Sequence, residues 1–120
     1  MRDHRKLRAF ELADELALLT YGETQTFPRA EVFGLTSQMR RAAVSVPSNI
    51  VEGCARNTEK DYLRFLDTAY GSAKEVEYQS SLAKCLGYLS NNKLEESAAE
   101  AARVLNALIN ALRKGGGEND

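Results

Sequence analysis

Apolar residues recur at steps of three and four in four long segments of the chain, which is the spacing of one face of an α-helix. The segments are residues 6–20, 36–56, 58–89 and 92–113. In the last of them the steps alternate between four and three, as in coiled-coil packing. The connections between the last three segments are short, which favours antiparallel neighbours. The pattern therefore predicts an all-α, up-down four-helix bundle.

Residues that cap or stop helices set the expected ends of these segments. Thr36 or Ser37 is suited to begin the second helix. Asn57 or Thr58 is suited to begin the third, and Thr58 forms a capping box with Asp61. Asn91 or Asn92 is expected to begin the fourth helix, and the glycines at 115–117 to stop it. We thus expect a bundle over residues 6–113, a flexible basic N-terminus at 1–5 and a disordered tail at 114–120.

The second segment carries a proline inside its helical pattern. Pro47 removes the NH that would bond the carbonyl of Ala43, so a bend is expected here. Apolar residues cover more than half of the circumference of this helix, and the polar residues around the proline form one stripe along it. An arc this wide is typical of a helix buried on two sides, by its own bundle and by something else.

We interpret the stripe as a polar layer that fixes the register of the bundle. Asn49 and Glu52 are expected to reach Ser72 and Glu75 on the third helix, with Arg41 supplying the counter-charge. The proposed members of the layer are Arg41, Ser45, Asn49, Glu52, Ser72 and Glu75. The alternative is that the stripe faces solvent and that Pro47 marks a loop between two short helices.

Gly71, midway along the third segment, has two interpretations. A missing side chain lets another helix approach closely at this point. The other interpretation is a tolerated mid-helix glycine, which costs about 1 kcal/mol relative to alanine.

The charge is nearly balanced but unevenly placed. The formal net charge is −1, which argues against a chain that binds nucleic acid over its whole surface. Positive charge gathers near the N-terminus and around the second helix, and such patches bind phosphate locally. The candidate nucleic-acid contacts are Arg2, Arg5, Lys6, Arg8, Arg40, Arg56, Lys60 and Arg64.

The residue inventory excludes most catalytic sites. His4 is the only histidine, whereas di-iron bundles, zinc hydrolases and serine or cysteine triads need histidine as ligand or base. Glu52, Glu75 and Glu77 leave one remote enzymatic alternative, a carboxylate site for a divalent ion. We expect no catalytic residue, no cofactor and no small-molecule substrate.

The remaining composition points to an ordinary protein of the cytoplasm. Cys54 and Cys85 stand 31 residues apart outside any metal-binding motif and are expected to be reduced. The chain has no secretory signal and no apolar run of the roughly 18 residues that span a membrane. We therefore expect a cytoplasmic location and no membrane partner.

Three stretches of the sequence resemble a known family. They are "LTSQMRRAAVSVPSNIVEG" at 35–53, "YLRFLDTAYGSAKEVE" at 62–77 and "LGYL" at 86–89. The chain resembles the four-helix-bundle proteins encoded in intervening sequences of bacterial large-subunit ribosomal RNA. The resemblance implies a left-handed bundle that assembles as a homopentamer, without an established biochemical activity. Similar accessory proteins of diversity-generating retroelements form basic pentamers that contact nucleic acid, whereas the pI here is about 5.9.

Two function classes follow from these observations. The first is a non-enzymatic, oligomeric protein interaction or scaffold module whose partner is itself. The alternative is a pentamer that binds RNA or another nucleic acid. Exposed basic residues in a row would favour nucleic acid, whereas arginines held in pairs with acidic residues would favour a structural role.

Overall fold

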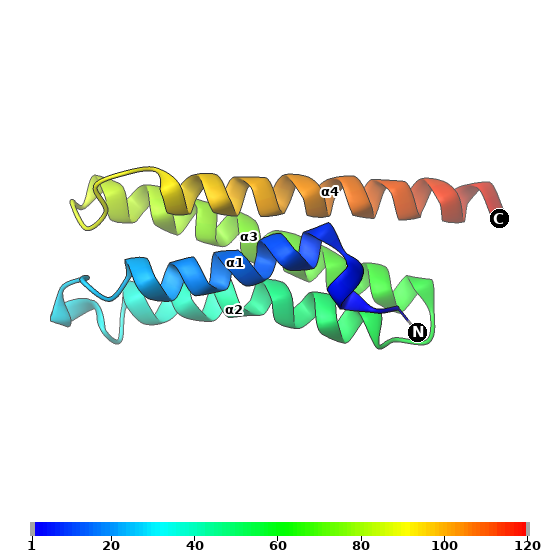
Figure 1. The fold of residues 1–120 in the computed structure, drawn as a ribbon, viewed down its shortest axis with the longest axis horizontal. Helices are drawn as coiled ribbons and strands as arrows, with labels where there is room; N and C mark the ends of the chain where they lie inside the picture. The colour runs from blue at the N-terminus through cyan, green and yellow to red at the C-terminus, as the bar shows by residue number, and fades with distance from the viewer. Residues whose placement is uncertain (1, 120) are drawn as a thin grey trace.

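The computed structural model describes residues 2–119, with side chains described through residue 115, and every regular element in this range is helical (Figure 1). The long helices are α1 (Arg8–Glu23), α2 (Leu35–Cys54), α3 (Glu59–Cys85) and α4 (Lys93–Asn119). Two short 3-10 helices, η1 (His4–Lys6) and η2 (Arg29–Glu31), precede α1 and α2. The four segments predicted from periodicity are thus confirmed as helices.

The helices run alternately up and down in a bundle about 51 Å long and 20 Å across. α1 packs against α2 and α4, and α3 packs against the same two helices. Their apolar faces meet in one core in which Leu16, Met39, Leu66 and Leu105 are fully buried. Burying a side chain of this size contributes about 1.5–3 kcal/mol. One chain is described, so the homopentamer and the handedness of the bundle stay predictions.

Helix α2 does not use its predicted cap. It begins at Leu35 with Gly34 in the cap position, and neither Thr36 nor Ser37 caps it. Instead the Glu31 carboxylate accepts a hydrogen bond from the Leu35 amide, with 3.0 Å between Oε1 and N. A Cβ on residue 34 would lie 2.7 Å from that same oxygen, so this approach requires glycine.

The predicted end of α3 at 89 is wrong by one turn. The helix ends at Cys85, and Gly87 adopts a positive φ of 83°. The Tyr88 amide donates to the Ala83 carbonyl and the Gly87 amide to the Lys84 carbonyl. This pair of bonds is the Schellman motif, which needs a left-handed residue and therefore favours glycine. At the other end, the predicted Thr58 cap is confirmed: its hydroxyl accepts from the Asp61 amide at 3.2 Å.

The N-terminal segment, which was predicted to be flexible, contacts the bundle, and α4 is longer than predicted, while the disorder of the tail stays a prediction. The Arg2 amide donates to the Cys54 carbonyl at 3.3 Å, which joins the N-terminal segment to the end of α2. At the other terminus, α4 continues to Asn119 rather than ending at 113, and residue 120 lies outside the described residues. A glycine weakens a helix interior by about 1 kcal/mol but does not terminate it without a left-handed conformation.

The close approach expected at Gly71 occurs at Gly53 instead. A Cβ on Gly71 would meet nothing within 4 Å, so it is a tolerated, exposed mid-helix glycine. A Cβ on Gly53 would lie 3.0 Å from the Phe65 Cβ and 3.3 Å from the Tyr62 carbonyl oxygen. The last turn of α2 can therefore lie directly on the first turns of α3.

Candidate functional site

Three residues of the predicted polar layer are in contact. The Ser45 and Ser72 hydroxyl oxygens lie 2.8 Å apart, which joins α2 to α3. The Asn49 amide nitrogen donates to both the carbonyl and the hydroxyl oxygen of Ser45, at 2.7 and 2.9 Å. All three side chains are half-buried. The contact is thus a polar link at the edge of the α2–α3 interface.

The other three members of the predicted layer do not join it. Arg41, Glu52 and Glu75 are exposed, and in the described chain no carboxylate lies within 4.0 Å of Arg41. Glu75 accepts a hydrogen bond at 3.3 Å from Gln79 on its own helix. Arg41 and Glu75 nevertheless line one cavity with Ser45 and Ser72. Direct contacts therefore join three of the six predicted members, and the wider layer stays a prediction.

Pro47 lies inside one unbroken helix. α2 runs from Leu35 to Cys54 through the proline, whose side chain is buried. The alternative of a loop between two short helices is therefore wrong, and the predicted bend stays a prediction.

Most basic residues near the N-terminus already have partners. Arg2 lies over the Tyr62 ring, 4.0 Å from its centre, and its guanidinium is 4.0 Å from Glu59. Arg5 pairs with Asp3 at 3.0 Å and holds the pKa of that carboxyl below its usual value. Arg8 pairs with two glutamates, on α1 and α4.

The basic residues around the α2–α3 turn are partly paired. Arg56 lies 4.7 Å from the centre of the Phe65 ring and donates to the carbonyl of Glu52. Arg64 pairs with Asp61 at 3.6 Å and approaches the same ring. Lys6 and Lys60 are exposed, and neither has a carboxylate within 4.0 Å in the described part of the chain.

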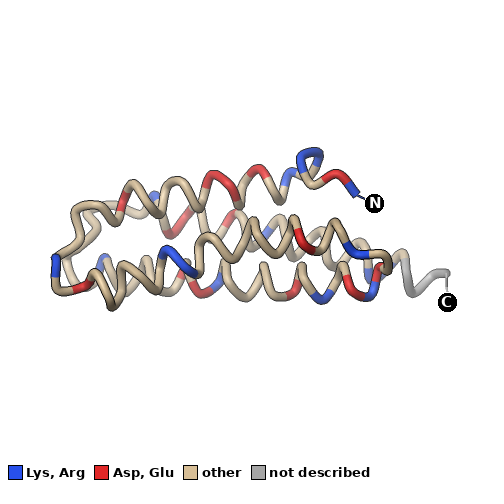
Figure 2. Tube along the Cα trace, turned by 90° about the horizontal axis from the view of Figure 1, so that it is seen from below, with Lys and Arg blue, Asp and Glu red and all other residues tan. Residues whose placement is uncertain are grey.

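The two basic groups lie at the same end of the bundle. The contact of Arg2 with Tyr62, near the start of α3, brings the N-terminal segment to the α2–α3 turn. Acidic residues are interspersed with the basic ones along the bundle (Figure 2). Opposite charges this close cancel each other's field within about a Debye length, roughly 10 Å at 0.1 M salt.

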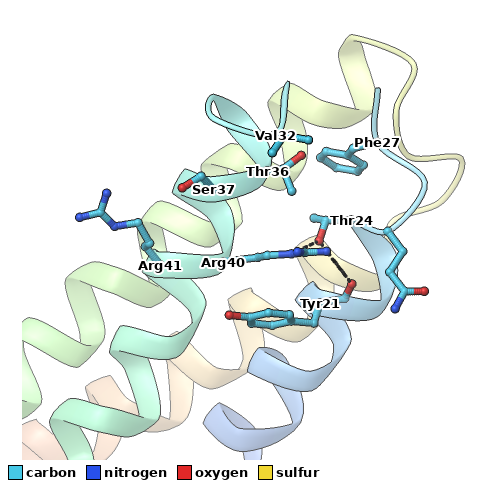
Figure 3. Close-up of a pocket in the computed structure, with 9 residues that line it drawn as sticks. Tyr21, Thr24, Phe27, Val32, Thr36, Ser37, Arg40 and Arg41 are labelled. Carbon is cyan, nitrogen blue, oxygen red and sulfur yellow. Dashed lines mark hydrogen bonds between the residues drawn. The ribbon is translucent and has the colours of Figure 1, made fainter. Parts of the chain in front are cut away.

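Arg40 lies apart from these groups, near the start of α2 and beside the end of α1 (Figure 3). The connection between α1 and α2 is at the opposite end of the bundle from the α2–α3 turn (Figure 1). Its Nε donates to the Thr24 hydroxyl at 2.9 Å, and its Nη2 approaches the Tyr21 carbonyl oxygen at 3.4 Å. The guanidinium carbon is 4.7 Å from the centre of the Tyr21 ring. The Thr24 hydroxyl in turn donates to the Thr20 carbonyl, which leaves its lone pairs to Arg40. The place of Arg40 at the edge of the apolar sector of α2 indicated that it needs a partner, but the sequence did not identify Thr24 and Tyr21, which precede it by 16 and 19 residues.

No metal centre forms among the described residues. They contain no group of three histidine, cysteine, aspartate or glutamate side chains placed to hold an ion. Of the three glutamates considered, Glu77 pairs with Lys74 at 2.9 Å and Glu75 contacts Gln79. None of the described helices is both long enough and apolar enough to cross a membrane.

Comparison with models of protein families identifies the family of this chain. The model of the 23S rRNA-intervening sequence protein family matches residues 5–110. The chain belongs to this family. The match begins within η1, contains α1, α2 and α3, and extends well into α4, so it covers most of the bundle described above.

A solved structure of similar fold agrees with this membership. It is a protein of unknown function from the S23 ribosomal protein family of Bacteroides thetaiotaomicron. The two chains superpose with a TM-score of 0.76 at 20% identity, over 85% of this chain and 95% of that one. At this identity the likeness concerns the fold alone. A comparison with curated proteins gave no match.

Proposed function

We propose that the protein is a non-enzymatic interaction module that assembles with copies of itself, as a pentamer. The observation that carries this proposal is a row of exposed apolar side chains on the outer face of α1 and α2. Leu18 and Tyr21 are 70% and 45% exposed, and Val44 and Val51 are 39% and 37% exposed. In the segment that connects the two helices, Phe33 is 98% exposed.

The contact between Arg40 and Tyr21 places these residues on one face. Arg40 of α2 lies over Tyr21 of α1, and the two helices run in opposite directions. Leu18 precedes Tyr21 by one turn of α1, and Val44 follows Arg40 by one turn of α2. Because the helices are antiparallel, Leu18 and Val44 lie at the same height. We call Leu18, Tyr21, Val44 and Val51 the apolar row. A repeated heterologous contact through this row would close a ring of identical subunits.

A measurement of mass in solution tests this proposal. Light scattering on a sizing column is expected to give five times the chain mass of 13.3 kDa. The double variant Leu18→Ser/Val44→Ser is expected to give smaller species, because it removes apolar area from the row. The control is Tyr78→Ser on α3, which is 66% exposed and lies outside the row. A monomeric parent, or an equal effect of the control, would contradict the proposal.

A second candidate function is binding of structured RNA at the end that carries both basic groups. Its support is the position of Lys6 and Lys60 on one end, each without an acidic partner in the described chain. In a ring, weak contacts would repeat once per subunit and add by multivalency. The pairing of Arg5, Arg8 and Arg64 with carboxylates favours the interaction module instead.

A filter-binding series with ribosomal RNA fragments distinguishes the two functions. Binding through phosphates is expected to weaken steeply from low to physiological salt. The variant Lys6→Gln/Lys60→Gln should weaken it further, whereas Lys93→Gln, at the start of α4 and thus at the opposite end of the bundle (Figure 1), should not. Absence of retention at low salt would end the RNA hypothesis.

A further inference from the structure

A cavity of about 420 Å³ lies between the end of α1 and the first turns of α2 (Figure 3). Tyr21, Phe27 and Val32 supply its apolar wall. Its polar groups include Thr36 and Arg40, with Gln25, Ser37 and Arg41 close by. Concave sites with apolar walls and a few convergent polar groups are the usual form of a small-molecule site.

Arg40 brings positive charge into this cavity in a fixed orientation. The Thr24 hydroxyl, the Tyr21 carbonyl and the Tyr21 ring hold the guanidinium from one side. In the described chain no acceptor contacts Nη1, and no carboxylate lies within 4.0 Å of the half-buried group. A planar guanidinium with free N–H groups matches the geometry of a carboxylate or phosphate.

The Thr36 hydroxyl, which lacks a hydrogen-bond partner, is a second and independent observation at this cavity. Its side chain lines the cavity, the residue is only 7% exposed, and its hydroxyl has no hydrogen-bond partner. Figure 3 shows this side chain between Val32 and Phe27. A buried polar atom without a partner is unfavourable, so native proteins seldom leave one.

The start of α2 also borders the cavity. Thr36 and Ser37 are the second and third residues of α2, where backbone amides have no acceptor within the helix. The first amide, that of Leu35, is taken by the Glu31 carboxylate. The Glu31 carboxylate offsets part of the helix dipole at this end, and the Arg41 side chain points away from the cavity (Figure 3), so the positive charge at the cavity comes from Arg40.

We propose that this cavity binds a small organic anion, a carboxylate or phosphate group carried on an aromatic or aliphatic body. The oxyanion lies against Arg40, with the Thr36 hydroxyl as a further donor. The body of the ligand lies against Phe27, Val32 and the Tyr21 ring. All of these groups come from one chain, and the site shares Tyr21 with the apolar row.

Titration calorimetry on the full-length, assembled protein tests the site with three defined anions. Benzoate and phenyl phosphate carry an aromatic body, and inorganic phosphate has none. At least one aromatic anion is expected to bind saturably, with an affinity about tenfold above that of inorganic phosphate, because only it covers the apolar wall. Benzyl alcohol, which is neutral, is expected not to bind. Whichever aromatic anion binds more tightly identifies the preferred headgroup.

Two variants and a matched control make the test specific. Arg40→Met is expected to weaken binding of the aromatic anion by about tenfold or more, since it removes a charge-assisted pair. The control Arg56→Met removes an arginine with the same 4.7 Å distance to an aromatic ring and should leave binding unchanged. Thr36→Val should weaken binding while the melting temperature of the unliganded protein stays equal or rises, because an unpartnered hydroxyl is removed.

Three results would overturn the proposal. The first is the absence of saturable binding by all three anions at millimolar concentration. The second is an equal loss of binding in Arg40→Met and Arg56→Met. The third is a Thr36→Val variant that melts at a lower temperature and binds as the parent does, which would show a structural hydroxyl.

Discussion

Ser45 is the residue at which polar contacts join α2 to α3. Its hydroxyl contacts Ser72 across the helix interface and receives the Asn49 amide from one turn further along α2. The same amide donates to the Ser45 carbonyl, next to the turn in which Pro47 removes a backbone donor. These short polar side chains therefore supply hydrogen bonds in a stretch where the helix itself has lost one.

Asn49 and Glu52 should differ in their effect on stability although both were assigned to one layer. Asn49→Ala is expected to lower the free energy of unfolding by about 1 kcal/mol, because the half-buried Ser45 loses its donor. Glu52→Ala should change it by less than about 0.5 kcal/mol, since that side chain is exposed. Denaturant unfolding of both variants measures the difference. Equal losses would restore Glu52 to the layer.

Tyr62 should make stability depend on alkaline pH. Burial, followed by the neighbouring Cys54 thiol, raises the pKa of Tyr62 from its ordinary 10.0 to about 12. The folded chain therefore keeps this proton between pH 10 and 12, where the unfolded chain releases it. The contribution of Tyr62 to stability is complete below pH 10 and is lost as the pH rises through 12.

Removal of the Tyr62 hydroxyl separates its contribution to stability from that of other groups that titrate at alkaline pH. Tyr62→Phe is expected to show a shallower fall of the free energy of unfolding between pH 10 and 12 than the parent. Tyr78→Phe, at an exposed position on α3, should follow the parent curve. Denaturant melts at several pH values provide the measurement, and parallel curves for all three proteins would contradict the assignment.

At the scale of elements, the sequence predicted the helices better than their ends. The positions of the helices follow from apolar spacing, which the core confirms from Leu16 to Leu105. The Thr58 cap was predictable because it acts within one turn. The start of α2 was not, because its cap comes from Glu31, whose other oxygen accepts from Tyr88 across the bundle end.

Gly71 and Gly53 show that the contact between two helices is as hard to predict from the sequence as a helix end. A pattern of residues does not tell which face of a helix meets a neighbour at a given height, so the close approach was considered at Gly71 and not at Gly53. Only the placement of Phe65 and Tyr62 beside Gly53 identifies the close contact between α2 and α3.

Alanine at these two glycines should act in opposite directions. Gly71→Ala is expected to raise the free energy of unfolding by about 0.5–1 kcal/mol, because the new methyl group meets no atom and the helix gains propensity. Gly53→Ala should lower it by about 1–3 kcal/mol, because the methyl group would press on α3. Denaturant unfolding decides, and a stabilising Gly53→Ala would mean that α2 and α3 separate without cost.

At the scale of the whole molecule, the candidate sites depend on contacts between distant parts of the chain. The basic residues were visible in the sequence, but their pairing was not: Arg8 meets Glu100 of α4, and Arg2 meets Tyr62 of α3. The partners of Arg40 likewise come from the end of α1. The sequence therefore predicted which residues carry charge, and the fold determined which charges stay available.

The two cysteines should report on opening of the whole bundle. Cys54 is 1% exposed, and burial raises the pKa of its thiol, whereas Cys85 is exposed at the end of α3. An aromatic disulfide reagent is expected to modify one thiol per native chain quickly and the second only as the chain unfolds. The variant Cys85→Ser should lack the fast phase. Simultaneous reaction of both thiols would show that the α2–α3 contact opens in the native state.

The Glu31 carboxylate connects two loops that lie 57 residues apart in the chain. One oxygen holds the first amide of α2, and the other accepts from the Tyr88 hydroxyl after α3, at 2.9 Å. Phe27 and Tyr88 also pack together, with ring centres 5.3 Å apart. The two loops therefore form a single cooperative unit for local unfolding. In deuterium exchange, we expect their amides to be protected together and to become labelled at a common rate, ahead of the helices that the loops connect.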